Sequence, residues 1–511
     1  MFIWTKSSAH RVFPNLRKDR DDVSFLSLVS GRNMHASGQI LVREHWNFSV
    51  KSMEITGIPA EWVTFYRQEY TTYNDGMPYP DRLSPVLAGE VKSHVTQSLW
   101  VVVCVPADAE AGLYKGEVTV YTEGSDNPKI PVTLQVFPVT LPDAADGTYD
   151  HEYFFTYTDM SRFDASIERY SERWWNIMTS YAKAMKRLRV NNLDLTLLGL
   201  LAGEGTYRTG VDTWQFNFER ADAFIEHFFA HGSFRRIVLG APTSSLMADK
   251  TYAVDENGKG LTLDTRSEEG EAFLRAYFAA VREHFTEKGW YDITATHLSD
   301  EPHESGNWLW LRSLVAEVCP GMPITEPMDT YEPTLDMAEA CDEFIPRLEV
   351  YEQGKDFYDK RAAAGKRLWC YSCCFPEQHW FLNKFIDLPH HWSRLIHWAC
   401  YSNNITGFLH WGFNYWGGEM YGIAPMARFK GDGFIVYPDK ENECVQFSNR
   451  ALATWEGIEE YELMRILAEK QPETVKAVCT GMAAGFHEFE ADPDALDCAR
   501  NELFGLLNFC G

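Results

Sequence analysis

The sequence lacks the patterns that would identify a secreted disulfide-linked protein or a membrane protein. Its 511 residues include 11 cysteines, an odd number spread along the whole chain, which does not fit a disulfide framework. No apolar stretch reaches the length needed to cross a membrane, and the start, "MFIWTKSSAHRVFPNLRKDRDD", has no apolar segment of signal-peptide length. We therefore expect free thiols, a cytoplasmic location and no membrane partner.

Positive charge is also scarce. The formal net charge is −26 and the calculated pI is near 5.0, with no basic run that reverses this balance locally. Nucleic acid and anionic lipid surfaces would be repelled by such a chain, so neither is expected as a partner. The sequence contains neither a phosphate-binding loop nor a glycine-rich dinucleotide fingerprint, and we predict no cofactor.

No metal-ligand spacing stands out either. Cys370, Cys373 and Cys374 form "CYSCC", but this run lies in an apolar strand without a second ligand pair, which favours buried free thiols over a redox or zinc site. His390 and His391 form a pair with no accompanying metal pattern. We predict no metal.

Aromatic residues, in contrast, are abundant, at 14% of the chain with 17 Trp, 24 Tyr and 32 Phe. Two interpretations are open. These side chains can anchor a large core, or some of them can stack on the C–H faces of sugar rings. Composition alone favours the first.

The pattern of the chain changes near residue 142. Up to that point, segments such as "SLWVVVCVP", "GLYKGEVTVYTEG" and "IPVTLQVFPVTLP" read as strands joined by turns, while "TYNDGMPYPDRLSP" reads as a long loop. We predict a β-sandwich over residues 1–142.

From residue 143 to 466, strand and helix segments alternate. Eight strands can be found, and their spacing fits right-handed βαβ units that close into a (β/α)8 barrel. A doubly wound sheet would show the same alternation, but the count of eight favours the barrel. Residues 467–511 are predicted to form a C-terminal helical appendage. The predicted strands are "EYFFTY", "NLDLTLLGL", "FRRIVLG", "YDITATHL", "MPITEP", "DEFIPRLEVY", "KRLWCYSCC" and "ITGFLHWGFNYW".

Two adjacent acids, Asp300 and Glu301 in "HLSDEP", follow the fourth predicted strand. In a barrel this places them at the end that carries active sites. Two close carboxylates cannot easily both ionise, so one pKa should rise. The simpler interpretation is a helix start, with Ser299 or Asp300 as the N-cap.

An adjacent pair suits one kind of glycosidase chemistry better than another. Two carboxylates that flank a glycosidic bond are about 5–9 Å apart and normally come from different strands. In a substrate-assisted mechanism the 2-acetamido group of the sugar is the nucleophile instead. One carboxyl then protonates the leaving group, and the other holds the acetamido N–H.

Several stretches together resemble glycoside hydrolase family 123, the β-N-acetylgalactosaminidases and their relatives. They run in the expected order from about residue 78 to 466. The resemblance implies a β-sandwich joined to a (β/α)8 barrel, and retaining, substrate-assisted hydrolysis of terminal β-N-acetylgalactosaminides, with Glu301 as general acid/base and Asp300 orienting the acetamido group. The matching stretches are "YPDRLSP", "LWVVVCVPADAEAGLYKGEVTV", "HLSDEPH", "LWCYSCC", "GFLHWGFNYW", "GDGFIVYP" and "ATWEGIEEYELMRIL".

Further candidates for sugar binding come from the barrel strands. Tyr371 can bind the acetamido oxygen or belong to the barrel core, and Trp369 on the same face can line the pocket lower down. Trp411 and Trp416 can form an apolar floor under the sugar or pack in the core, with Asn414 between them as a ligand for a hydroxyl. His297 points into the barrel, either as a substrate contact or as a buried, hydrogen-bonded histidine.

Three functions therefore remain open. The first is the N-acetylgalactosaminidase, with a glycan or glycoconjugate as partner and a homo-oligomer as one possible state. The second is a β-N-acetylglucosaminidase or another exo-glycosidase on the same fold. The third is a non-catalytic carbohydrate-binding protein, which the presence of both Asp300 and Glu301 disfavours.

Overall fold

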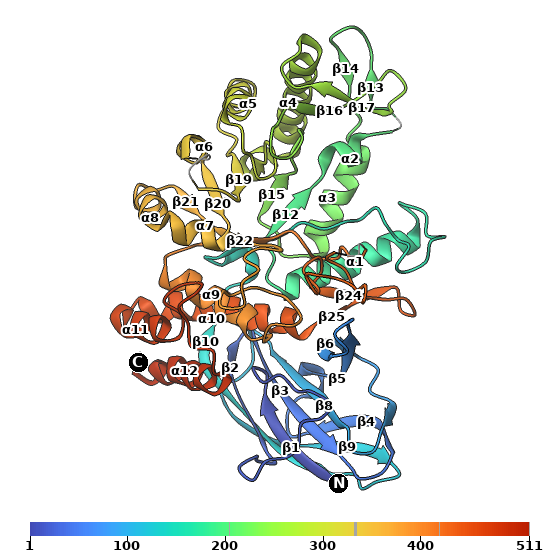
Figure 1. Ribbon diagram of the computed structural model, residues 1–511, viewed down its shortest axis with the longest axis vertical. Coiled ribbons are helices and arrows are strands. Elements are labelled where there is room, and N and C mark those ends of the chain that lie inside the picture. Colours follow the sequence, from blue (N-terminus) through green and yellow to red (C-terminus); the bar gives the residue numbers. More distant parts are fainter. Residues whose placement is uncertain (204, 332–334, 418–419, 510–511) are drawn as a thin grey trace.

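Two five-stranded sheets form the N-terminal part of the chain (Figure 1, blue to cyan). The structure, a computed structural model, describes residues 1–203, 205–331, 335–417 and 420–509. Neighbouring strands pair antiparallel in both sheets, except that β10 and β2 run parallel. In sheet order, the first contains β1 (Phe2–Ser7), β3 (Met34–Arg43), β8 (Thr96–Val105), β5 (Val63–Thr72) and β6 (Pro78–Ser84), and the second β2 (Leu26–Arg32), β10 (Lys129–Thr140), β9 (Gly112–Glu123), β4 (Phe48–Thr56) and β7 (Gly89–Val91).

The two sheets share one apolar core. Ile40 and Val101 of the first sheet belong to the same buried cluster as Val118 and Leu134 of the second. In β10, buried and more exposed residues alternate, as the sequence pattern predicts for a strand with one face covered. Complete burial of each such side chain contributes about 1.5–3 kcal/mol, so this shared face holds the two sheets together.

One predicted loop contains a strand. The segment rich in Pro, Gly and Asp around residue 78 forms β6, which pairs with β5 at the edge of its sheet. An edge strand has one side without ladder partners, so it tolerates prolines such as Pro78 and Pro80 that cannot donate a backbone hydrogen bond. The prediction of a long loop was wrong for residues 78–84.

Parallel strands in the second part of the chain pair in a continuous ring. Six of them form one sheet in the order β18-β15-β12-β11-β23-β22, and three more form the sheet β19-β20-β21. Two isolated parallel bridges, Thr296–Ile324 and Arg347–Tyr371, join these sheets at both ends. The strands are β11 (Asp150–Tyr153), β12 (Asn192–Leu195), β15 (Arg236–Leu239), β18 (Thr294–Thr296), β19 (Thr325–Met328), β20 (Glu343–Pro346), β21 (Arg367–Leu368), β22 (Cys370–Ser372) and β23 (Gly407–His410).

These strands lie in the eight segments that the sequence predicts, because β21 and β22 are two parts of one segment. Helices connect them. Ser267 caps the longest, α4, by accepting a hydrogen bond from the Gly270 N–H, and Gly289 ends it in the left-handed conformation. The helices of this part are α1 (Glu172–Arg187), α2 (Leu197–Leu201), α3 (Glu219–His231), α4 (Glu268–Lys288), α5 (Ser305–Val318), α6 (Leu335–Ala340), α7 (Leu348–Gln353), α8 (Lys355–Ala363), α9 (Trp392–Ser402) and α10 (Asn449–Ala468).

Three hairpins interrupt the alternation and were not predicted. Their strands are short or polar, so they carry little of the apolar periodicity that reveals a strand. The sequence also favours a helix that begins with "VQF", residues 445–447, but these residues belong to β25. The hairpins are β13 (Tyr207–Arg208) with β14 (Trp214–Gln215), β16 (Lys250–Val254) with β17 (Gly260–Asp264), and β24 (Val436–Asp439) with β25 (Cys444–Phe447).

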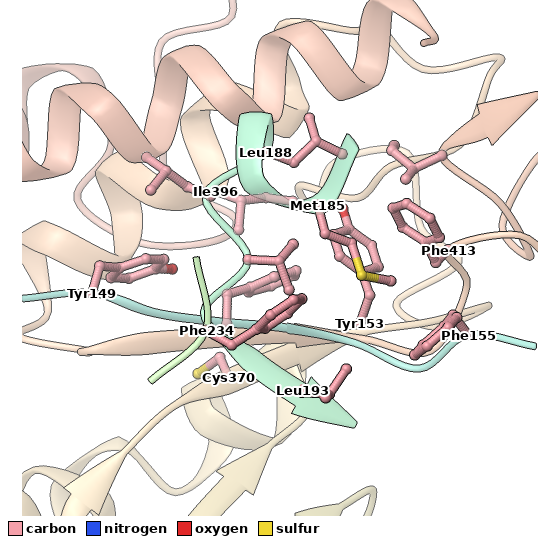
Figure 2. Close-up of a cluster of buried hydrophobic side chains, with 14 of the residues drawn as sticks. Tyr149, Tyr153, Phe155, Met185, Leu188, Leu193, Phe234, Cys370, Ile396 and Phe413 are labelled. Atoms are coloured by element: carbon pink, nitrogen blue, oxygen red, sulfur yellow. The ribbon is translucent and has the colours of Figure 1, made fainter. Parts of the chain in front are cut away.

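A large apolar cluster packs the ring against the helices on one side (Figure 2). Tyr153 of β11 and Leu193 of β12 lie among side chains from the helices, including Met185 of α1 and Ile396 of α9. All four are at most 1% exposed. This packing fixes the strands, and therefore the chain segments that leave their ends.

Helix α10 connects the parts of the molecule through buried carboxylates. Glu459 accepts hydrogen bonds from the backbone N–H and Nδ1 of His35 in β3, and Glu462 accepts from the backbone N–H groups of Thr148 and Tyr149 just before β11. Glu460 binds Arg394 of α9 and lies 3.0 Å from Arg500 Nε. Each partner satisfies a charge that burial alone would disfavour.

Two helices follow α10, α11 (Pro472–Met482) and α12 (Pro493–Leu506), in line with the helical C-terminus predicted over residues 467–511. Residues 510 and 511 of that prediction lie outside the described residues. None of the helices in the described part of the chain is long and apolar enough to cross a membrane. Short 3-10 turns complete the secondary structure: η1 (Ala60–Trp62), η2 (Ala144–Asp146), η3 (Tyr291–Ile293) and η5 (Leu507–Phe509).

Candidate active site

Asp300 and Glu301 follow β18 in an irregular segment and do not belong to a helix. The ladder continues one residue beyond β18, where the His297 N–H donates to Leu239 O of β15 (2.8 Å). Helix α5 begins at Ser305, and Glu304 caps it by accepting from the N–H groups of Gly306 and Asn307. The helix-start interpretation with Ser299 or Asp300 as the N-cap was therefore wrong.

Glu301 is held in a specific position from the facing side of the ring. Its φ of 48° lies in the left-handed region, which costs roughly 1–3 kcal/mol for a residue other than glycine and points to a functional constraint. The Tyr371 hydroxyl donates a hydrogen bond to Glu301 Oε1, and Arg347 Nη1 lies 4.0 Å from the same oxygen. Arg347 and Tyr371 are also the residues of the bridge that joins the two parallel sheets.

Asp300 is fixed by the loop that follows β15. Ser245 Oγ donates to Asp300 Oδ2 (3.4 Å), and the Leu246 N–H donates to the Asp300 carbonyl oxygen (2.8 Å). The His303 N–H donates in turn to the Leu246 carbonyl (2.6 Å). Leu246 and Ala248 have φ values of 62° and 47°, so this loop carries the same kind of strain as Glu301.

Burial raises the pKa of both acids. For Glu301, the hydrogen bond from Tyr371 opposes this effect, and the charges of Asp329 and Asp300 add to it. Solvent reaches the Asp300 side chain, but protein atoms surround it on the other sides. The resulting desolvation raises the pKa of Asp300, and the positive charge of His297 partly offsets this rise. Both carboxyls are therefore easier to protonate than free ones.

His297 lies beneath the pair, buried and hydrogen-bonded on both ring nitrogens. Nδ1 is 2.8 Å from the Thr325 carbonyl oxygen, and Nε2 is 3.4 Å from Glu152 Oε1. Burial lowers the pKa of His297, but the hydrogen bond and charge of Glu152, with Glu326 and Asp194, outweigh it and raise the pKa to about 9. The ring is therefore cationic at neutral pH. Of the two roles expected for His297, a substrate contact or a buried, hydrogen-bonded histidine, these contacts match the second.

Glu326 supports the segment from below. Its Oε2 accepts hydrogen bonds from the N–H groups of Leu298 and Ser299 (3.0 and 3.4 Å) and from Trp308 Nε1 (2.8 Å). Burial raises the pKa of Glu326 to about 7, although His297 and these donors oppose the rise. One buried carboxylate thus fixes the backbone just before Asp300.

Aromatic side chains lie on the opposite flank, after β23. The Trp411 ring is half-buried, 5.3 Å from the ring of Tyr415 between centroids, and its Nε1 donates to Asp432 Oδ2 (2.9 Å). Burial, with the charges of Asp194 and Asp300, raises the pKa of Tyr415, so its hydroxyl lies in the field of the acids. Trp411 and Tyr415 provide partly exposed aromatic surface near the pair.

Three other predicted residues have structural contacts instead. Asn414 uses both ends of its amide on the backbone of Thr156, at 2.8 and 2.7 Å, so its side chain is held against the main chain. Trp416 is 3% exposed and donates through Nε1 to the Val436 carbonyl. Of its two expected roles, sugar-binding floor or core packing, this burial matches core packing. Trp369 is completely buried and packs under Tyr371 in a small apolar cluster.

Several residues of this site were missed from the sequence. Arg347 follows β20, and Asp329 follows β19, where its Oδ1 lies 2.7 Å from His303 Nε2 and its Oδ2 lies 3.9 Å from Arg347 Nη1. The only available signal was position: Asp329 comes just after the predicted strand "MPITEP", whereas Arg347 lies inside the predicted strand "DEFIPRLEVY", of which only Glu343–Pro346 forms β20. Tyr415 was missed because the chain beyond residue 410, where β23 ends, is irregular, so no strand periodicity indicates where its side chain lies.

The cysteines of "CYSCC" differ in environment. Cys370 is buried, as expected, whereas Cys373 and Cys374 are half-buried, and their Sγ atoms are 4.0 Å apart.

Comparison with known proteins places this site in a family. Residues 164–467 match the model for "Glycoside hydrolase 123, catalytic domain". Among solved structures, a family 123 glycoside hydrolase from Clostridium perfringens, described in terms of glycolipid glycan hydrolysis, is 15% identical with a TM-score of 0.79. The match covers 99% of this chain and 98% of that one. A search of curated proteins found no match.

Two further solved structures match with much lower scores. A Bacteroides ovatus family 5 xyloglucanase has 8% identity and a TM-score of 0.32 over 86% of this chain and 98% of its own. A β-glucuronidase from an uncultured Clostridium species has 10% identity and a TM-score of 0.36 over 83% and 88%. Scores this low do not bear on the fold.

Proposed function

Because this chain belongs to glycoside hydrolase family 123, and is therefore a glycosidase, we propose that it releases terminal β-linked N-acetylgalactosamine with retention of configuration. The observation that carries the proposal is the position of Asp300 and Glu301, adjacent at the end of one strand, each held by a different neighbour. Such a pair suits catalysis in which the 2-acetamido group of the substrate is the nucleophile.

In this mechanism, Glu301 is the general acid. Its raised pKa keeps a larger fraction protonated near neutral pH, so it can donate a proton to the glycosidic oxygen as that bond breaks. The acetamido oxygen attacks C1 from the other face and forms an oxazolinium ion, which keeps the N–H proton. The Glu301 carboxylate then takes a proton from water, whose oxygen attacks C1 and opens the ring, so that the neutral acetamido group is restored. Two inversions give net retention.

Asp300 accepts a hydrogen bond from the acetamido N–H and stabilises the charge that develops there. The hydrogen bond from Ser245 and the Leu246 contact support this role, because they fix the carboxylate before substrate arrives. In the free protein the Tyr371 hydroxyl binds Glu301, and we propose that it turns to the acetamido oxygen in the complex. Trp411 and Tyr415 form the apolar wall beside the sugar.

A conventional mechanism would need a second carboxylate as nucleophile, and Asp329, whose charge affects Glu301, is one alternative. Its side chain is occupied by His303 and lies near Arg347, which disfavours attack on a sugar carbon. The contacts of Asp329 with His303 and Arg347 therefore favour the substrate-assisted mechanism over the two-carboxylate mechanism.

We further interpret the ring of parallel strands as a (β/α)8 barrel and the two N-terminal sheets as a β-sandwich. The proposed domains are residues 1–142, 143–466 and 467–511. The position of the acids after β18, at the carboxyl end of the strands, supports the barrel, since barrel enzymes carry their active sites there. The substrate would be an oligosaccharide or glycoconjugate, a class that includes the glycolipid glycans of the Clostridium perfringens relative.

A panel of p-nitrophenyl β-glycosides tests the proposal. We expect the N-acetyl-β-galactosaminide to be cleaved fastest and the β-galactoside, which lacks the acetamido group, to be cleaved very slowly. Faster cleavage of the N-acetyl-β-glucosaminide would identify an N-acetylglucosaminidase instead. A β-galactoside cleaved as well as the acetamido sugar would contradict substrate assistance, and sugar binding without cleavage would indicate a carbohydrate-binding protein.

A further inference from the structure

Two adjacent thiols lie at the edge of the candidate site. Cys373 and Cys374 follow β22 in a bend, both half-buried, with their Sγ atoms 4.0 Å apart. A pair of thiols at this separation can bind one atom together, which single thiols cannot do. Neither the family match nor the proposed mechanism uses them.

The backbone around this pair is held in place. The Cys373 N–H donates to the Phe375 carbonyl (3.0 Å), and Asn383 Nδ2 donates to the Cys373 carbonyl (3.0 Å). Because these contacts fix the main chain, the two side chains stay close without loop rearrangement. Little conformational entropy is then lost when both sulfurs bind the same ligand.

The pair is close to the catalytic acids. Cys373 is two residues after Tyr371, whose hydroxyl binds Glu301, and it lies within range of the charges of Glu301 and Arg347. The exposed ring of Phe375 follows directly, under the guanidinium of Arg347, and Tyr421 lies beside Cys374. A group bound to both sulfurs would therefore occupy the rim of the site and meet aromatic surface.

We propose that Cys373 and Cys374 form a vicinal dithiol site for thiophilic trivalent arsenic, and that its occupation blocks the enzyme. Sulfur ligands suit soft, thiophilic centres. With phenylarsine oxide, each thiol gives up its proton and forms one As–S bond, while the arsenic-bound oxygen leaves as water. Arsenic stays trivalent, so the step needs no oxidant. The block on catalysis rests on the proposed function, whereas the binding does not.

The other cysteines in the described part of the chain provide controls. Five are buried, so they are not accessible to the reagent: Cys319, Cys341, Cys370, Cys400 and Cys479. Cys104 and Cys444 are half-buried and line one cavity of about 670 Å³ between the N-terminal sheets and α1, and Cys498 is exposed on α12. Cys444→Ser and Cys498→Ser therefore remove accessible thiols away from the site.

The experiment treats the full chain with phenylarsine oxide and measures intact mass, the modified peptide and residual hydrolysis. We expect one phenylarsenic group per chain, bridging Cys373 and Cys374, with activity restored by 2,3-dimercaptopropanol but not by a monothiol. Cys373→Ser and Cys374→Ser should each weaken binding on the order of 100-fold, because the second sulfur then no longer binds intramolecularly. Cys444→Ser and Cys498→Ser should behave as the unaltered protein.

Two results would overturn the proposal: no stable adduct on the unaltered protein, or an adduct that persists in both Cys373→Ser and Cys374→Ser. An adduct that maps to the pair but leaves hydrolysis unchanged would refute the blocking effect. An adduct on a protein that cleaves no sugar in the panel would refute the proposed function and leave the dithiol site standing.

Discussion

The Tyr371 hydroxyl of β22 donates a hydrogen bond to Oε1 of Glu301, which lies 70 residues earlier in the sequence, in the irregular segment after β18. This bond opposes the effect of burial on the Glu301 pKa. Tyr371 therefore influences both the direction in which the carboxyl points and the pH at which it holds its proton.

Replacement of the acids should separate binding from turnover. Glu301→Gln cannot donate the proton and Asp300→Asn holds the acetamido group more weakly, so we expect each to lower kcat by about 10²–10⁴-fold. Sugar binding, measured calorimetrically, should survive. The control is Glu317→Gln, a surface glutamate on α5 that pairs with Arg275. Turnover at the unaltered level in both site variants would contradict the proposed roles.

Tyr371→Phe should move the pH dependence of the reaction. Without its hydrogen bond, the Glu301 pKa loses an effect that lowers it, so the alkaline limb of the kcat/KM profile should shift to higher pH. The matched control is Tyr358→Phe, because the buried Tyr358 hydroxyl makes no hydrogen bond. An unmoved limb, or the same shift in both variants, would mean that Tyr371 does not tune Glu301.

The two acids should also reduce stability at neutral pH. Their pKa values are raised above the ordinary 3.8 and 4.5, so the folded state binds protons more tightly than the unfolded one. The contribution of these two acids to stability is then most favourable at acid pH, and it decreases as pH rises through the raised pKa values. Asp300→Asn should melt at a higher temperature than the unaltered protein near pH 7, and the difference should vanish near pH 3. A difference that does not depend on pH would exclude this cause.

The buried ion network of α10 should couple the regions of the molecule. Arg394 donates from Nε to Glu460 (2.7 Å) and from Nη1 to Glu456 (3.2 Å), with all three side chains buried. Arg394→Met leaves buried carboxylates with fewer partners and should cost about 3–5 kcal/mol of unfolding free energy, measured by urea denaturation. Arg173→Met, which removes an exposed ion pair, is the control and should change little. Equal effects would argue against the network.

The eight strand segments of the ring could be predicted because parallel strands are continuous apolar runs, and Asp300 and Glu301 could be singled out because two adjacent acids follow one of them. The contacts that these two acids make could not be predicted from the sequence. Arg347 and Tyr371 reach Glu301 only because β20 and β22 come together in the ring, and pairing between strands is invisible to local periodicity. After β23 the chain is irregular, so strand periodicity could not show that Tyr415 lies near Asp300 while Asn414 contacts the backbone of Thr156.

The short polar strands could not be found for a related reason. Strands such as β13 and β14 are two residues long and contain no buried residue, so they show no apolar periodicity. β6 was hidden by its prolines, which only its edge position permits.

The carboxylates of α10 limit how this architecture can change by recombination. Glu456 binds Ser37 in the N-terminal sheet, Glu462 binds the entry to β11, and Glu460 contacts Arg500 in the C-terminal helices. A catalytic region transplanted next to a foreign sheet would carry these acids into a surface without matching donors. The parts of such a chain must therefore be inherited together, and exchange between relatives should succeed only when the donors move with the helix.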